Sequence, residues 1–240
     1  MSEVSAPVHV VTGGTGALGR AVVELLLARG DRVAVPYRGE RGFEELREQA
    51  NGSESLFGAP ADIALTGEAA RFVAKTVERF SRIDGAALLA GAYASTGNFE
   101  TAAESEWELM LRANLHSVYA AVRALLPELL KYGGSVVTVG SSYASAGGAG
   151  AAAYAVSKNA VAALTRTLAL ENRARGVRFN LIEPGIIDTP ANRSAMPTAD
   201  MSQWTPPQRI AAIVAFLLSR ESAPVSGGVI PVAGAAPGPA

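Results

Sequence analysis

A glycine-rich turn between a predicted strand and a predicted helix is the feature that most constrains this chain. Residues 8–11 (VHVV) form a short apolar, β-branched run, which is typical of a buried strand. The turn TGGTGALG follows at 12–19, and a helix-forming stretch then runs to Gly30. Glycines allow a tight turn and a close approach of the backbone, and the free N–H groups at a helix start attract phosphate. This order of elements predicts a dinucleotide-binding α/β fold.

Strands and helices are predicted to alternate along the rest of the chain. The expected strands are 32–37, 56–63, 84–89, 134–140, 177–183 and 228–232, and the expected helices are 66–80, 104–131, 151–175 and 208–219. Pro127 is expected to kink or restart its helix. The alternation predicts one Rossmann-type domain over 1–240, a doubly wound parallel sheet of about seven strands with helices on both faces. A ligand is then expected where the first, fourth and fifth strands end, and the tail 235–240 is expected to be flexible.

Composition excludes several classes of function. A net charge of −1 gives no electrostatic footprint for nucleic acid or for an anionic membrane. The chain has no cysteine, and His9 and His116 are its only histidines, so we expect no disulfide and no metal site. No basic, apolar leader pattern opens the sequence, and no apolar run reaches the roughly 18 residues of a membrane span. These features predict a cytoplasmic protein that binds neither nucleic acid nor a membrane.

The end of the second predicted strand carries the residues that select the cofactor. A carboxylate there would accept a hydrogen bond from the ribose 2′-hydroxyl and favour NAD. The chain instead has Tyr37 and Arg38, with Arg41 nearby. A guanidinium suits a 2′-phosphate, so NADP(H) is favoured, while Glu40 keeps NAD as the alternative and the arginines can equally be solvated loop charges. Asp62, after the third strand, either binds the adenine amino group or caps a turn.

Tyr154 and Lys158 stand at positions i and i+4 of a predicted helix, so their side chains share one helix face. An ammonium close to a phenol lowers the phenol pKa from its usual value of about 10. The pair therefore predicts a general acid/base for proton transfer near neutral pH. A tyrosine at a helix edge beside a solvated lysine is the structural alternative.

Together these residues resemble the short-chain dehydrogenases/reductases over nearly the whole chain. TGGTGALG resembles the family's cofactor loop, and YAVSK at 154–158 resembles its Tyr-x-x-x-Lys signature. Ser141 stands at the family's usual spacing before Tyr154, with Ser142 as the second choice, and Asn114 resembles the asparagine of the catalytic tetrad. The resemblance implies that Tyr154 exchanges the proton, Lys158 lowers its pKa and binds the nicotinamide ribose, and Ser141 holds the substrate oxygen. It also implies that Asn114 anchors a water near Lys158.

The resemblance further implies a set of cofactor-binding residues. PGIIDTP at 184–190 resembles the family's segment that holds the nicotinamide carboxamide. The complete expected set is Gly13, Thr15, Gly16, Ala17, Leu18, Gly19, Tyr37, Arg38, Asp62, Ile63, Ala90, Gly91, Tyr154, Lys158, Pro184, Gly185, Ile187 and Thr189. A homotetramer or dimer is expected as in the family, because the helices 104–131 and 151–175 carry alanine and leucine on more than one face.

The substrate-side segment leaves the function open between several readings. Thr189–Pro207 resembles the corresponding stretch of dihydropteridine reductases and is predicted to form a substrate lid over 189–207. The leading function is hydride transfer between NADP(H) and a small organic carbonyl or alcohol. The alternatives are reduction of a quinonoid dihydropterin and non-catalytic sensing of a dinucleotide. Tyr93 and Tyr143 either line the substrate pocket or pack, and Trp204 either packs or closes the lid.

Overall fold

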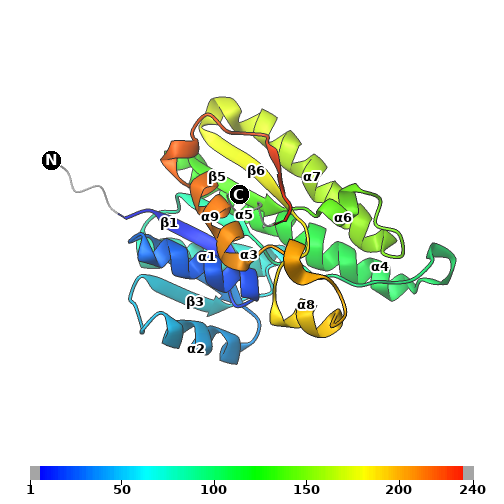
Figure 1. Cartoon of the computed structure of the whole chain (residues 1–240). Coiled ribbons are helices and arrows are strands. Elements are labelled where there is room, and N and C mark those ends of the chain that lie inside the picture. The colour runs from blue at the N-terminus through cyan, green and yellow to red at the C-terminus, as the bar shows by residue number, and fades with distance from the viewer. Residues whose placement is uncertain (1–5, 235–240) are drawn as a thin grey trace, which may run out of the picture.

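The fold was analysed in a computed structural model that describes residues 6–234; residues 1–5 and the predicted tail 235–240 lie outside the described residues. Parallel strands form one seven-stranded sheet in the order β3-β2-β1-β4-β5-β6-β7 (Figure 1). The strands are β1 (Val8–Thr12), β2 (Arg32–Tyr37), β3 (Leu56–Pro60), β4 (Gly85–Leu88), β5 (Gly134–Val139), β6 (Val177–Pro184) and β7 (Val229–Val232). The order reverses between β1 and β4, which is the switch point of a doubly wound sheet.

Helices cover both faces of the sheet. α1, α2 and α9 pack on one face, and α3, α5 and α7 pack on the other (Figure 1). The α-helices are α1 (Ala17–Ala28), α2 (Glu40–Gln49), α3 (Thr66–Phe80), α4 (Glu104–Met110), α5 (Ser117–Tyr132), α6 (Ser142–Ser145), α7 (Ala152–Asn172), α8 (Pro190–Ala195) and α9 (Pro207–Leu218). The predicted Rossmann-type fold is confirmed. Within residues 6–234, no helix combines the length and the apolar character needed to cross a membrane.

The apolar pattern of the sequence explains this layering. Every residue of β1 and of β4 is buried, because helices cover both faces of the central strands. In α3 the buried residues Ala69, Phe72, Val73, Thr76 and Phe80 recur every three or four positions, which is the spacing of one helix face. A continuous apolar run therefore becomes a central strand, and a periodic one becomes a covering helix.

The region predicted as one helix over 104–131 is instead interrupted near its middle. α4 gives way to a π-helical segment, η2 (Leu111–His116), before α5 begins. The expected restart at Pro127 is wrong, because α5 continues through this residue. Pro127 lies on the exposed side of α5, where water can satisfy the carbonyl that loses its N–H partner, while buried Leu125 and Leu129 hold the helix on the sheet.

Other boundaries also differ from the predictions. The third strand ends at Pro60, two residues before Asp62, and the sequence reading missed α2. Only Phe43 and Leu46 of α2 are buried, so its charged sequence offers just two apolar residues, three positions apart, as a sign of a helix.

Arg178 fixes the chain that joins α9 to β7. Its guanidinium donates hydrogen bonds to the carbonyls of Leu217 (3.2 Å), Ser219 (2.9 Å), Ser222 (3.0 Å) and Val225 (3.2 Å). Burial lowers the pKa of Arg178 below its ordinary value. Among the described residues, Arg178 is the one charged side chain of β6 that bonds to this connection. The arginine therefore holds the last strand in place.

We expect Arg178→Met to lower the free energy of unfolding by about 2–3 kcal/mol, because hydrogen bonds to a charged group contribute about 1.5–3 kcal/mol each and neighbouring ones do not add. Urea unfolding measures the change. Arg166→Met is the matched control, since Arg166 is exposed on α7. Equal effects of the two substitutions would contradict the role given to Arg178.

Candidate active site

The glycine turn lies directly against the end of β4. A Cβ at Gly13 would stand 2.8 Å from the backbone nitrogen of Ala90, and φ of Gly13 is +69°. A Cβ at Gly19 would stand 2.1 Å from the Gly13 carbonyl oxygen. Side chains at these two positions would therefore fill the space in which the turn packs. The cradle fits the close backbone approach that a dinucleotide pyrophosphate needs.

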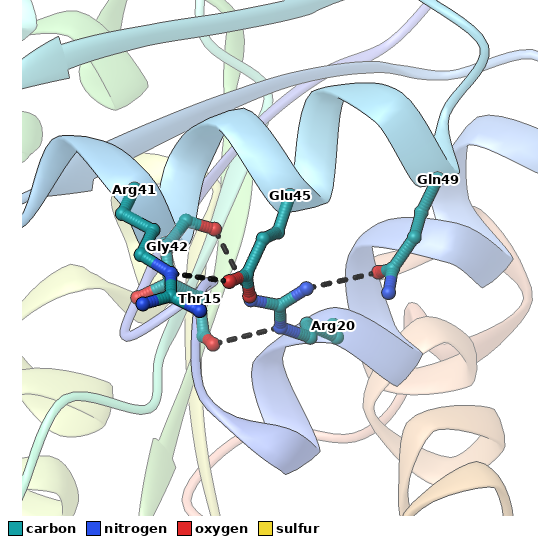
Figure 2. A network of polar contacts seen from close by, with 6 residues as sticks. All are labelled: Thr15, Arg20, Arg41, Gly42, Glu45 and Gln49. Carbon is teal, nitrogen blue, oxygen red and sulfur yellow. Dashed lines mark hydrogen bonds and ion pairs between the residues drawn. The ribbon is translucent and has the colours of Figure 1, made fainter.

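A polar network ties this turn to α2 (Figure 2). Arg20 donates from Nε to the Thr15 carbonyl (2.9 Å) and from one terminal nitrogen to the Gly42 carbonyl (3.2 Å) and to Glu45 (2.9 Å). The other Glu45 oxygen accepts from Arg41 Nε at 3.1 Å, so one carboxylate holds two arginines. Hydrogen bonds from Arg41 and then Arg20 keep the pKa of Glu45 below its ordinary value. The sequence reading missed Arg20 and Glu45, because their contact needs α1 and α2 to be side by side.

A cavity of about 460 Å³ opens at the carboxyl ends of the central strands. It lies where the topology places a ligand, between the glycine turn, the ends of β4, β5 and β6, and α7 and α8. The lining residues are Leu18, Leu89, Gly91, Ala92, Tyr93, Val139, Gly140, Ser141, Tyr143, Tyr154, Lys158, Pro184, Gly185, Ile186, Ile187, Asn192 and Met196. Three of the four predicted catalytic residues are thus brought together in its wall.

Tyr154 and Ser141 lie together in this wall, and the Ser141 side chain is close enough to oppose the rise in the Tyr154 pKa. Ser141 caps α6, and its hydroxyl also accepts from the Ala144 N–H at 3.4 Å. Ser142, the competing serine, donates instead to the Pro184 carbonyl at 3.2 Å. The structure therefore distinguishes the two serines, and the hydroxyl that faces Tyr154 belongs to Ser141.

The expected lowering of the Tyr154 pKa is not found. Burial raises the pKa of Tyr154 above its ordinary value; the Ser141 hydrogen bond opposes this shift and the nearby Tyr93 adds to it. The Lys158 Nζ lies 6.0 Å from the centre of the Tyr154 ring and donates to the Val139 carbonyl at 3.1 Å. Burial lowers the pKa of Lys158 itself to about 8. Desolvation of the phenol is therefore the largest cause of the shift in its pKa.

Asn114 lies beneath the cavity, in the π-helical segment. Its side chain is 1% exposed and makes a two-way pair with Ala92, donating to the carbonyl at 3.0 Å and accepting from the N–H at 2.9 Å. It also donates to the Ser157 hydroxyl at 3.1 Å. A Cβ on Gly91 would stand 2.6 Å from Asn114 Oδ1 and 3.3 Å from Lys158 Nζ. Asn114 thus joins the loop after β4 to the helix that carries Tyr154 and Lys158.

The predicted cofactor-binding residues are spread along one edge of the sheet. Those that line the cavity are Leu18, Gly91, Tyr154, Lys158, Pro184, Gly185 and Ile187. The others lie in the glycine turn, just after or at the ends of β2, β3 and β4, and at the cap of α8: Gly13, Thr15, Gly16, Ala17, Gly19, Tyr37, Arg38, Asp62, Ile63, Ala90 and Thr189. All of them therefore belong to the segments that follow the strand ends or begin the next helix.

Around the second and third strands, two candidates already have protein partners. The Tyr37 ring stacks on Phe43, with centroids 4.8 Å apart. Asp62 pairs with Arg112 at 2.7 Å and accepts from the Ala64 N–H at 3.1 Å. Although burial alone would raise the pKa of Asp62, these partners hold it below its ordinary value. Arg38 is exposed directly after β2.

The structure also shows which of the remaining aromatic residues line the cavity and which pack in the interior. Tyr93 and Tyr143 both line the cavity, whereas Trp204 is only 5% exposed and packs in the interior. Ile186, Asn192 and Met196 were missed as cavity residues. The sequence could indicate only that their segment borders the site, because an irregular stretch after a strand often covers a site.

A glycine cradle at the switch point, beside a serine, tyrosine and lysine in one cavity, defines the class of dinucleotide-dependent oxidoreductases on a Rossmann-type sheet. A family model described as Enoyl-(Acyl carrier protein) reductase matches residues 14–234. The chain belongs to the short-chain dehydrogenase/reductase family and is an oxidoreductase enzyme of that family.

Similar proteins cover almost the whole chain. The short-chain dehydrogenase/reductase aba4 of Botryotinia fuckeliana is 30% identical over 95% of this chain and 95% of its own length. Levodione reductase of Leifsonia aquatica is 31% identical over 95% and 92%. A crystal structure of levodione reductase has a TM-score of 0.87 at 29% identity, covering 95% of this chain and 96% of the other. An NADPH-bound short-chain oxidoreductase from Pseudomonas aeruginosa PAO1 has a TM-score of 0.85 at 27% identity, covering 94% and 95%.

The buried ammonium of Lys158 should make stability depend on pH. The unfolded chain has a lysine pKa of 10.5 and the folded chain one of about 8, so the unfolded state binds more protons between these values. The free energy of unfolding contributed by this group therefore rises with pH from about 8 to 10.5, and its full cost is present below pH 8. That cost is on the order of 3 kcal/mol.

We expect Lys158→Met to be more stable than the unsubstituted protein at pH 7, by on the order of 1–3 kcal/mol, because the cost of burying the charge disappears. The difference should shrink as the pH rises from 8 towards 10. Urea unfolding at several pH values measures it, with Lys75→Met as the control because Lys75 is exposed on α3. A difference that does not change with pH would contradict the buried-ammonium account.

Proposed function

We propose that this enzyme transfers a hydride between NADP(H) and the carbonyl or alcohol carbon of a small organic substrate, with Tyr154 as the general acid/base. The observation that carries the proposal is that Ser141, Tyr154 and the buried Lys158 line one wall of the same cavity, with Tyr154 and Lys158 on one helix. Two hydroxyls that converge on one point can hold a carbonyl oxygen and stabilise the charge that grows on it.

The residues divide the reaction among them. The nicotinamide, when bound, supplies or accepts the hydride. Ser141 holds the substrate oxygen, and Tyr154 gives its proton to that oxygen as the alcohol forms. A raised phenol pKa keeps Tyr154 protonated at neutral pH, which suits the direction of reduction. Lys158 contacts the nicotinamide ribose, and Asn114 anchors a water for proton exchange, as the family resemblance implies.

We expect Tyr154→Phe to lower kcat by at least about a thousandfold while Kd for NADPH changes less than about twofold, because only the proton donor is lost. NADPH oxidation with a ketone panel and NADPH fluorescence titration measure the two effects. Ser142→Ala is the control for a hydroxyl near the site that faces the Pro184 carbonyl. Turnover that survives in Tyr154→Phe would remove Tyr154 from the proton transfer. An unsubstituted protein that binds NADPH and reduces no carbonyl would favour the sensing alternative.

The preference for NADP(H) rests on Arg38. Arg41 pairs with Glu45 although it is exposed, whereas Arg38 is exposed directly after β2, at the ribose end of that strand. No carboxylate stands between Tyr37 and Glu40 to accept from a 2′-hydroxyl. The NADPH-bound relative supports this class of cofactor.

Arg38→Ala should weaken NADPH binding about tenfold to a hundredfold and leave NADH binding within about twofold, since only NADPH offers a phosphate to the guanidinium. Fluorescence titration with each cofactor gives the two Kd values. Arg41→Ala is the matched comparison and should have the smaller effect, because Glu45 holds that side chain. If the ratio of the two affinities is unchanged in Arg38→Ala, the argument for Arg38 fails.

The predicted lid over 189–207 is part of the proposal. An isolated bridge joins Ile187 to Thr205 at the base of this segment, and the Asp188 N–H donates to the Thr205 carbonyl at 2.9 Å. Asn192 on α8 and Met196 just after it reach the cavity between these fixed ends. A segment tied at its base can close over a substrate.

A second candidate is reduction of a quinonoid dihydropterin, favoured by the same segment, which resembles that of dihydropteridine reductases. Ser141 separates the two readings, because those enzymes lack this serine.

The proposal also includes a homotetramer or dimer, supported by the exposed apolar side chains of Leu109, Tyr119 and Val156. The cytoplasmic location stays a prediction from the sequence.

A further inference from the structure

The cavity is almost free of charge. Of the described residues that line it, Lys158 alone is formally charged, and its ammonium already donates to the Val139 carbonyl. The substrate side is formed by Tyr93, Tyr143, Ile186 and Met196, with the neutral amide of Asn192 among them. An anionic substrate group would lose its hydration here without finding a cation to pair with. The lining therefore favours an uncharged substrate.

Three tyrosine rings meet at one corner of this cavity. Tyr93 packs edge-on against Tyr154, with centroids 5.0 Å apart, and against Tyr143 at 6.3 Å. The Tyr143 hydroxyl donates to the Ala149 carbonyl, which fixes that ring from its far end. Tyr93 is 59% exposed although it touches the proton donor. Its free ring surface therefore stands next to the point where a substrate oxygen would meet Tyr154 and Ser141.

We propose that the substrate is an uncharged ketone in, or directly joined to, a flat ring, and that Tyr93 determines this specificity by packing its ring against the substrate ring. The inference rests on the proposed function, since it takes Tyr154 as the group that meets the carbonyl oxygen. Aromatic rings favour offset or edge-on packing with a flat partner, and an open alkyl chain offers no such surface.

The test compares three ketones with NADPH: 1-indanone, its 5-carboxylate, and 2-octanone. The first pair differs by one negative charge, and 1-indanone and 2-octanone differ in the flat ring. We expect kcat/KM for 1-indanone to exceed that for each of the others by at least about tenfold. Equal values for 1-indanone and its carboxylate would overturn the preference for an uncharged substrate. Equal values for 1-indanone and 2-octanone would overturn the preference for a flat ring.

Variants at Tyr93 test the residue itself. Tyr93→Ala should lower kcat/KM for 1-indanone about fivefold to tenfold, mainly by raising KM, and should leave 2-octanone and the Kd for NADPH within about twofold. Tyr93→Phe should retain the 1-indanone value, because the ring and not the hydroxyl makes the contact. Tyr132→Ala is the matched control, because Tyr132 ends α5 and has the same exposed fraction as Tyr93, 59%. A Tyr93→Ala variant that loses activity equally on both ketones would overturn the assignment.

Ligand-observed NMR with 1-indanone and the NADP⁺-loaded protein separates this inference from the proposed function. Binding that weakens in Tyr93→Ala, without reduction of any ketone, would overturn the proposed hydride transfer and keep the ring site. Reduction of 2-octanone that depends on Tyr154, without binding of 1-indanone, would keep the hydride transfer and overturn the ring site. Absence of both would overturn both.

Discussion

The rest of the structure depends on the contact between the glycine turn and the end of β4. Gly13 lies where a Cβ would meet the Ala90 backbone, and the Ala90 N–H donates to the Thr12 hydroxyl at 3.2 Å. This contact aligns the ends of β1 and β4 at the switch point, so that the start of α1 and the loop before Asn114 border one space. Because Gly19 also touches the Gly13 carbonyl, α1 can begin only at this angle. The cavity therefore depends on the lack of a side chain at Gly13 and Gly19 as well as on the residues that line it.

The sequence could predict the parts of this design that are written locally. A buried strand needs consecutive apolar residues, and a helix face needs a period near 3.6, so the strands and most helices were found. The pairing of Tyr154 and Lys158 could be predicted for the same reason, because their spacing lies within one helix. The polar helix α2 was missed because its two buried residues, Phe43 and Leu46, are too few to mark a helix face.

Contacts between distant segments could not be predicted in this way. Asn114 meets Ala92 and Ser157 across two connections, and the π-helical segment that turns it inward leaves no pattern in LRANLH. The expected restart at Pro127 failed for a related reason. A proline ends a helix only where the freed carbonyl lacks another partner, and exposure of that residue on α5 depends on which face the sheet covers.

The same limit explains the wrong direction of the Tyr154 pKa. Spacing shows that an ammonium lies near a phenol, but it does not show how deeply the site buries both. Burial favours the neutral form of each group, so the phenol stays protonated and the Lys158 ammonium is held at an energetic cost, with the Val139 carbonyl as its partner. A site that holds a neutral phenol beside a desolvated cation is poorer for stability than an apolar one of equal size. In the proposed hydride transfer, electrostatic influence on a substrate oxygen would be strongest where water is excluded, so the burial that costs stability would also make a fixed charge effective at this position.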